Sequence, residues 1–163
     1  MLQSPVIRFL LKALVFFGVW YLLYELWILP DGRLDEWVSL NIVGISAGIL
    51  ETVGYKTYTI NRIVGIMGDS GVEVVDRCNG IGALGLFLAF IFSYPGDWKN
   101  KLSFSVLGMG VIYLTNLFRI TFLTAARVEW PDRFGALHNY TTTPVFYIVI
   151  FALWMLWVKT QNE

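Results

Sequence analysis

The stretch "VVDRCNGIGALGLFLAFIFSYPG", residues 74–96, places the only cysteine of the chain, Cys78, directly before a long apolar run. After Asn79 this run contains no charged residue until Asp97. A helix of about 20 mostly apolar residues crosses a bilayer. The segment from about Asn79 to Tyr94 is therefore predicted to be a membrane span, with Cys78 at its first end.

The whole chain has the composition of an integral membrane protein. Of its 163 residues, 56% are hydrophobic and only 15% are charged, whereas soluble domains carry about 25% charged residues. The length suits one domain, so residues 1–163 are predicted to form a single integral membrane domain. The 12 basic and 12 acidic residues cancel, and nothing in the charge pattern indicates a nucleic-acid partner.

Three more segments qualify as membrane spans, which predicts an all-α, four-span helical bundle; they run from about Phe9 to Leu29, Leu102 to Ala126 and Pro144 to Val158. The stretch "LDEWVSLNIVGISAGILETVGY", residues 34–55, is ambiguous. Its apolar residues recur at helical spacing: Val38, Ile42, Ile45, Ile49 and Val53. We expect an amphipathic helix at the membrane surface. A fifth span is the alternative.

Basic residues predict the orientation in the membrane. With four spans, the N-terminus, the loop "YPGDWKNK" and the tail share one side, which carries Arg8, Lys12, Lys99, Lys101 and Lys159. Positively charged flanks mark the cytoplasmic side, so we expect a multi-pass protein of the cell inner (plasma) membrane. Residues 30–78 then form an extracytoplasmic block, in which "KTYTINRIVGIMGDSGVEVVD" predicts a short β-hairpin around the turn "GDSG".

Three polar residues arrive at the extracytoplasmic face in this topology: Cys78, Arg119 and His138. Cys78 precedes a helix, where unpaired N–H groups and the helix dipole favour a thiolate. Arg119 lies inside the apolar run "YLTNLFRITFLTAAR", at a cost of at least ~2.5 kcal/mol on insertion scales. Asn116 lies on the same helix face. His138 is the only histidine and directly precedes the last span.

Each of these features also has a purely structural explanation. Cys78 can be an inert small residue, Arg119 can extend to the interface without any chemistry, and His138 can be an interfacial anchor. Glycines after Cys78 can serve helix packing alone or the approach of a substrate backbone. The convergence of all three polar residues favours a functional site, with Asn79, Gly80, Gly82 and Asn116 as substrate-binding or supporting residues.

A thiol, an imidazole and a guanidinium together suit acyl transfer through a thioester. Histidine takes the thiol proton and returns it to a leaving amine, while arginine stabilises the thiolate or a tetrahedral oxyanion. A metal or haem site is the weaker reading, because Cys78 and His138 are too few ligands for a closed zinc site. We therefore expect neither a metal nor another cofactor.

The motifs "CNGIGAL", "NLFRI" and "LHNY", each at the outer end of its predicted span, resemble the exosortase/archaeosortase family over about residues 70–148. The resemblance implies a membrane cysteine transpeptidase or protease in which Cys78 is the nucleophile, Arg119 the stabilising cation and His138 the acid/base. It also implies the substrates: secreted proteins bearing a C-terminal motif, a transmembrane helix and a basic cluster.

Two further expectations concern partners. The substrate's helix is expected to pack beside the second and third spans among membrane lipids, where glycines allow close approach: Gly82, Gly85, Gly108 and Gly110. The alternative function is a non-catalytic membrane scaffold of an envelope or secretion complex. That alternative explains the glycines and the amphipathic segment but leaves the convergence of Cys78, Arg119 and His138 accidental.

Overall fold

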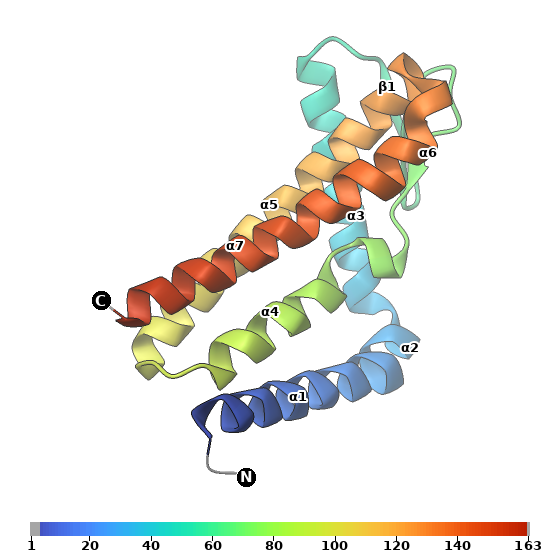
Figure 1. Cartoon of the computed structure of the whole chain (residues 1–163). Coiled ribbons are helices and arrows are strands. Elements are labelled where there is room, and N and C mark those ends of the chain that lie inside the picture. The colour runs from blue at the N-terminus through green and yellow to red at the C-terminus, as the bar shows by residue number, and fades with distance from the viewer. Residues whose placement is uncertain (1–3, 163) are drawn as a thin grey trace.

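The computed structural model is mostly helical and describes residues 4–162, leaving aside the side chains of Arg77, Thr141, Thr142 and Asn162 (Figure 1). Its main helices are α1 (Pro5–Leu23), α3 (Arg33–Thr52), α4 (Ile81–Ser93), α5 (Trp98–Glu129) and α7 (Thr143–Asn162). Short helical elements connect them: η1 (Tyr24–Ile28), α2 (Leu29–Asp31), η2 (Asp76–Cys78), η3 (Pro131–Arg133), α6 (Phe134–Ala136) and η4 (Leu137–Thr142). The strands are β1 (Thr57–Ile60), β2 (Ile63–Ile66) and β3 (Val72–Glu73).

Within the described residues, three continuous helical stretches are long and apolar enough to cross a membrane: Pro5–Asp31, Trp98–Glu129 and Pro131–Gln161. They correspond to the first, third and fourth predicted spans, and each extends beyond the predicted limits. The third stretch includes η4, so His138 lies inside a continuous helix and not in a loop before it.

The predicted second span is shorter than expected. Helix α4 has 13 residues, or about 20 Å at 1.5 Å per residue, against a hydrocarbon core of about 30 Å. It begins at Ile81 after Gly80, whose φ is 92°, and ends before Tyr94, which is extended because Pro95 follows. The count of four spans therefore stays a prediction, since α4 by itself does not cover the full thickness.

The short α4 sets the depth of Cys78. The Asn116 amide of α5 binds the Cys78 carbonyl, and Asn116 lies about 20 Å along the helix axis before the end of α5 at Glu129. Cys78 is therefore recessed well within the length of the neighbouring helix α5.

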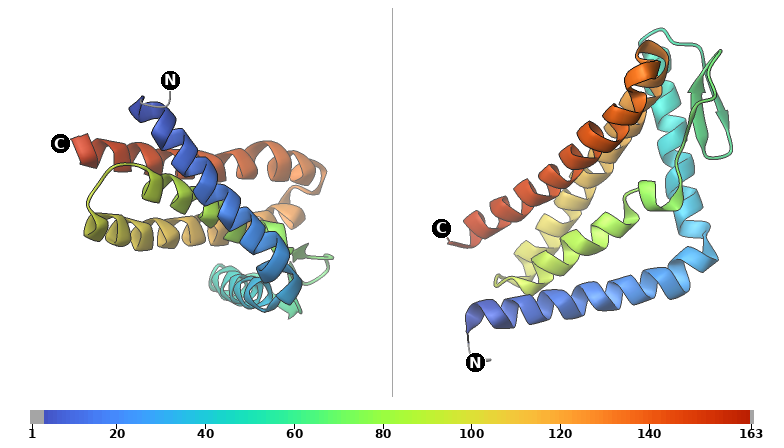
Figure 2. Two further views of the ribbon diagram at one scale, coloured as in Figure 1. Left: turned by 90° about the horizontal axis from the view of Figure 1, so that it is seen from below. Right: turned by 45° about the vertical axis from the view of Figure 1, so that its right-hand side comes forward.

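The basic flanks gather at one end of the bundle. Figures 1 and 2 show the start of α1, the α4–α5 connection and the end of α7 together at this end, with α3 and the sheet at the other. The connection packs closely on α7, since a Cβ at Gly96 would lie 2.6 Å from Gln161 and 2.9 Å from Trp157. This arrangement agrees with the predicted grouping of basic residues, while the side of the membrane on which they lie stays a prediction.

Helix α3 is not among the three candidate membrane-crossing stretches. Its predicted apolar stripe faces mostly outward, since Ile45, Ile49 and Val53 are exposed. The buried face combines apolar residues, Ile42 of the stripe among them, with two small polar ones: Ser39 is hydrogen-bonded to Arg62, and Ser46 to Thr121 of α5. An outward apolar stripe is typical of a helix in contact with lipid.

The predicted hairpin is a three-stranded antiparallel sheet in the order β1–β2–β3. The expectation missed β2, because the first turn is at Asn61, whose φ of 50° an asparagine tolerates, and not only at "GDSG". Within the sheet, the ring of Tyr58 covers Gly65, where a Cβ would lie 2.4 Å from the ring.

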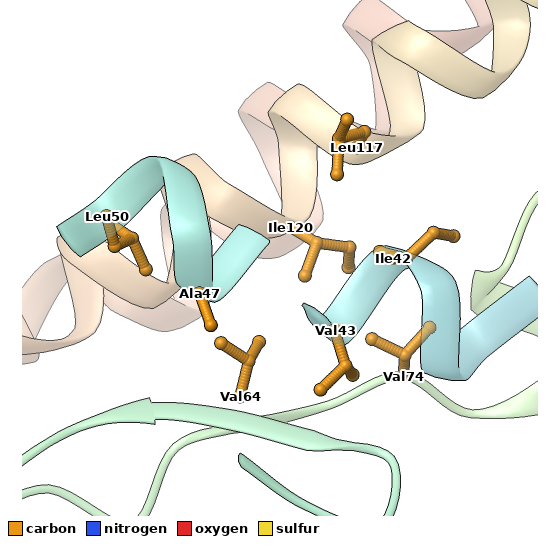
Figure 3. Close-up of a cluster of buried hydrophobic side chains, with 8 residues drawn as sticks. All are labelled: Ile42, Val43, Ala47, Leu50, Val64, Val74, Leu117 and Ile120. Atoms are coloured by element: carbon orange, nitrogen blue, oxygen red, sulfur yellow. The ribbon is translucent and has the colours of Figure 1, made fainter. Parts of the chain in front are cut away.

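Two buried clusters hold the elements together. One joins α3, the sheet and α5 through the residues in Figure 3: Ile42, Val43, Ala47, Leu50, Val64, Val74, Leu117 and Ile120. The other joins α4, α5 and α7 around Phe87 and Trp157. The first cluster fixes the segment that leads from the sheet to Cys78, and the second fixes the helix that follows it.

Two of the four glycines expected to receive a substrate helix are covered by the chain itself. A Cβ at Gly85 would lie 1.8 Å from the Trp20 ring, and a Cβ at Gly108 would lie 2.1 Å from the Phe87 ring. Only Gly82 and Gly110 face open space within 4 Å. The expectation of a four-glycine docking face is therefore wrong for Gly85 and Gly108.

This packing predicts that Gly108→Ala destabilises the fold. The fully buried Phe87 ring would have to move, and overpacking of this kind costs about 1–3 kcal/mol. Gly110→Ala, in the same helix but facing open space, is the matched control. The free energy of unfolding of the two purified variants, measured by a mixed-detergent titration, gives the difference. Equal free energies of unfolding would contradict the prediction.

Candidate active site

A cavity of about 380 Å³ lies where η1, the Cys78 turn, α5 and η4 meet. Cys78, Arg119 and His138 all line it, although they come from η2, α5 and η4. Of the predicted supporting residues, Gly80, Gly82 and Asn116 line it as well, whereas Asn79 does not. The volume falls in the usual range of ligand-binding pockets.

Cys78 ends a 3-10 turn and is partly exposed. Its N–H donates to the Val75 carbonyl, and its own carbonyl accepts from the Asn116 amide at 2.9 Å. Helix α4 begins three residues later, at Ile81. The turn therefore places Cys78 at the wall of the cavity while its backbone is held from α5.

Asn79 supports this turn from behind. Its side-chain oxygen accepts from the Ile81 N–H at 3.0 Å and so caps the start of α4. Its amide donates to Asp35 at 2.6 Å, and the Tyr24 hydroxyl donates to the same carboxylate oxygen at 2.9 Å. Asp35 is fully buried, so these hydrogen bonds to one oxygen offset part of the cost of burying its carboxyl group, whose other oxygen has no partner among the described residues. Three elements, η1, α3 and the Cys78 turn, meet at this carboxylate.

Arg119 and His138 are connected through Thr143. The Arg119 guanidinium donates to the Thr143 hydroxyl at 3.1 Å, and that hydroxyl donates to the His138 carbonyl at 2.9 Å. Arg119 is 9% exposed, and its Nε has no hydrogen-bond partner among the described residues. The cation therefore retains donor capacity at the wall of the cavity.

His138 lies in the π-helical turn η4, which ends two residues before Pro144. A proline ring collides with the carbonyl four residues earlier in an α-helix, and a wider π turn relieves this contact. The imidazole Nδ1 is 3.0 Å from the Asn139 side-chain oxygen. The tautomer with hydrogen on Nδ1 donates to Asn139, and Nε2 then carries the basic lone pair.

Asp76, the acidic residue nearest to Cys78 in sequence, does not line the cavity. It forms an ion pair with Arg62, whose guanidinium also donates to Ser39. This pair ties the Cys78 turn to the β1–β2 hairpin and to α3. Its role is consistent with structural support of the turn.

Several residues at the site were missed from the sequence. Tyr24, Glu25 and Thr143 line the cavity, and Asp35 supports it. The sequence could have identified Glu25, because an acidic residue inside an apolar span marks a functional position. Nothing in the sequence pointed to Asp35, since an acidic residue in the first turn of a helix is common at the surface. Among the described side chains, no group of three His, Cys, Asp or Glu residues could hold a metal ion.

Fold and cavity define a multi-pass helical membrane protein with a cysteine, an arginine and a histidine around one cavity. The sequence model of the transmembrane exosortase family (Exosortase_EpsH) matches residues 1–155, and the chain belongs to this family. A curated relative, "Probable archaeosortase D" of Methanocaldococcus jannaschii, is 24% identical over 153 residues, which cover 92% of this chain and 88% of the relative. No solved structure matches the chain.

The shared carboxylate predicts that Asp35→Ala weakens the fold and loosens the Cys78 turn. The substitution leaves the Tyr24 hydroxyl and the Asn79 amide without an acceptor, at about 1–3 kcal/mol for each buried group. We expect a lower unfolding free energy and faster alkylation of Cys78 in detergent. Asp35→Asn retains an acceptor oxygen and should show a smaller effect.

Asp31→Ala is the control, because the Asp31 carboxylate pairs with the exposed Arg33 and with no residue of the Cys78 turn. Little change is expected from it. An Asp35→Ala protein with the stability and the alkylation rate of the Asp31→Ala control would show that the carboxylate does not support the site.

Proposed function

We propose that this protein is a membrane-embedded cysteine transpeptidase or protease that processes the C-terminal sorting signals of secreted proteins. Membership of the exosortase family supports the class of enzyme. The observation that carries the residue assignment is the shared cavity of Cys78, Arg119 and His138. Residues 1–163 would act as a single membrane domain, without a metal or other cofactor.

The chemistry follows from the three side chains. His138 takes the proton of the Cys78 thiol, and the sulfur attacks the carbonyl carbon of the substrate peptide bond. A carbon–sulfur bond forms, the tetrahedral intermediate collapses, and the carbon–nitrogen bond breaks. The departing amine receives the proton from His138, which leaves a thioester on Cys78. An amine acceptor or water then attacks the thioester, the carbon–sulfur bond breaks, and the thiol regains a proton.

Arg119 is the proposed electrostatic partner. Its guanidinium is held by Thr143 and lies within an apolar helix, where a fixed positive charge interacts more strongly than in water. It can stabilise the thiolate or the oxyanion that develops during attack. Thr143 also donates to the His138 carbonyl, so one hydroxyl connects the Arg119 guanidinium to the helical turn that contains His138.

The lining of the cavity fits a peptide that continues into a membrane helix. Its polar residues lie near the sheet end of the bundle, while aromatic side chains line it toward the opposite end: Phe17, Trp20 and Tyr21 of α1, and Phe146 and Tyr147 of α7. One helical turn, 5.4 Å tall and about 10 Å wide, fills on the order of 400 Å³. The cavity therefore suits the residues around the cleaved bond, with the substrate helix outside it in the lipid.

Replacement of the nucleophile provides the direct test. We expect Cys78→Ser and Cys78→Ala to abolish processing of a co-expressed secreted protein that carries a motif, a transmembrane helix and a basic cluster, because neither variant can form the thioester. Arg119→Gln and His138→Gln should each lower the rate by about 10²-fold or more. Immunoblotting of precursor and product measures the result.

Gly110→Ala is the control for expression and membrane insertion, because it faces open space outside the cavity. Processing that continues unchanged in a Cys78→Ala protein would refute the nucleophile assignment.

The sidedness of the site can be read from the single thiol. We expect a small, membrane-impermeant methanethiosulfonate to modify Cys78 in right-side-out vesicles, because the cavity is proposed to open at the extracytoplasmic face. Inside-out vesicles should react only after detergent is added. Mass spectrometry of the purified chain measures the modified fraction. Reaction in intact inside-out vesicles alone would reverse the proposed topology.

A further inference from the structure

A second cavity, of about 500 Å³, lies at the end of the bundle opposite the Cys78 turn. It is formed by the first turns of α1 and by the end of α4 with the following Pro95. Its floor contains aromatic side chains, since the rings of Phe9 and Tyr94 pack edge to face at 5.7 Å. No residue of this cavity also lines the Cys78 cavity.

Positive charge is concentrated on this cavity. Arg8 and Lys12 line it and lie four residues apart, on one face of α1. Within residues 4–162, neither forms an ion pair. Lys101 of α5 donates to the Phe92 carbonyl at 3.1 Å, next to Ser93, so a third cation lies close to the cavity. These cations would therefore be stabilised by an anion in the cavity.

Two further features of the same cavity indicate a hydrogen-bonding anion. The first turn of the 19-residue helix α1 contains no acidic residue, and no side chain caps it, so its positive dipole end is uncompensated. Ser93 lines the cavity and is 5% exposed, yet its hydroxyl has no hydrogen-bond partner in the described part of the chain. A rotation about one side-chain bond lets this hydroxyl donate to a ligand.

We propose that this cavity binds the phosphate of an anionic phospholipid headgroup. Arg8 and Lys12 would bind the phosphate oxygens, and Ser93 would donate a hydrogen bond to one of them. The neighbouring surface of α1 favours a lipid over free phosphate, because Val15, Phe16 and Val19 follow Lys12 on the same helix face and are exposed and apolar. An acyl chain attached to the phosphate would cover this surface.

The proposed lipid site does not depend on the proposed enzyme activity. It lies beside the last residue of α4, whereas Cys78 precedes the first, so its lipid would lie away from the Cys78 thiol. Binding there would hold α1 against α4, and α1 supplies one wall of the Cys78 cavity. Binding of an anionic lipid in one leaflet would thus stabilise the α1 wall of the Cys78 cavity.

The experiment is lipid binding by the full-length chain purified in a neutral detergent. Native mass spectrometry and thermal unfolding would follow titrations with phosphatidylglycerol, with phosphatidylcholine and with inorganic phosphate. We expect saturable binding and a raised unfolding temperature with phosphatidylglycerol, and weaker effects with the other two. Inorganic phosphate that binds as tightly as phosphatidylglycerol would replace the lipid with a soluble anion and overturn the proposal.

Variants locate the binding. The double substitution Arg8→Gln/Lys12→Gln should weaken phosphatidylglycerol binding by about 30-fold, at about 1 kcal/mol for each cation. Lys99→Gln/Lys159→Gln removes equal charge at the same end of the bundle and should change it less than about twofold. Equal losses in the two double variants would show general surface attraction and overturn the site.

Ser93→Ala separates ligand binding from a structural role. Removal of an unsatisfied hydroxyl should leave the lipid-free unfolding temperature unchanged or raise it, while phosphatidylglycerol affinity falls several-fold. An unchanged affinity would overturn the proposed hydroxyl contact. A lipid affinity that is unaffected by all three substitutions would overturn the site as a whole.

Discussion

The structure depends on one constraint: the non-helical backbone between β3 and α4 lies among apolar helices and must find its hydrogen bonds within the protein. Asn116 binds the Cys78 carbonyl, and Asn79 caps the Ile81 N–H. Asn79 is in turn held by the buried carboxylate of Asp35, which also binds Tyr24. Side chains from η1, α3 and α5 are thus committed to one short turn, and their helices must meet there. The position of the thiol follows from this convergence.

Two interruptions of helical regularity supply other parts of the cavity wall. The π-helical turns η1 and η4 precede Pro30 and Pro144, respectively. Because a proline excludes the usual contact with the carbonyl four residues before it, a widened turn is a natural accommodation. Tyr24 and Glu25 come from the first turn and His138 from the second. Tyr24, Glu25 and His138 are therefore supplied by irregular turns, whereas Asn116 and Arg119 come from the regular helix α5.

The two ends of the bundle differ in chemistry. At one end, a sheet, a buried carboxylate and the ion pair of Arg62 with Asp76 support the Cys78 turn. The α5 end is tied to the same region, because Arg127 binds Asp69 and lies over the Phe134 ring. At the other end, aromatic packing among Phe9, Phe90 and Tyr94 is surrounded by basic residues. The two ends of the bundle therefore differ: polar side chains support the Cys78 turn at one, and basic residues flank aromatic packing at the other.

The sequence by itself determined the membrane class, three long helices, the grouping of the basic flanks and the motif residues that line the cavity. These depend on local composition and on spacing along the chain, which hydropathy and charge report directly. Only the tertiary structure decided that α4 is short and that β2 exists. It also decided that the rings of Trp20 and Phe87 cover Gly85 and Gly108, and that Asp35 is buried beneath the Cys78 turn. Such features depend on which distant segments meet, and a single sequence contains no local signal for a contact between residues 35 and 79.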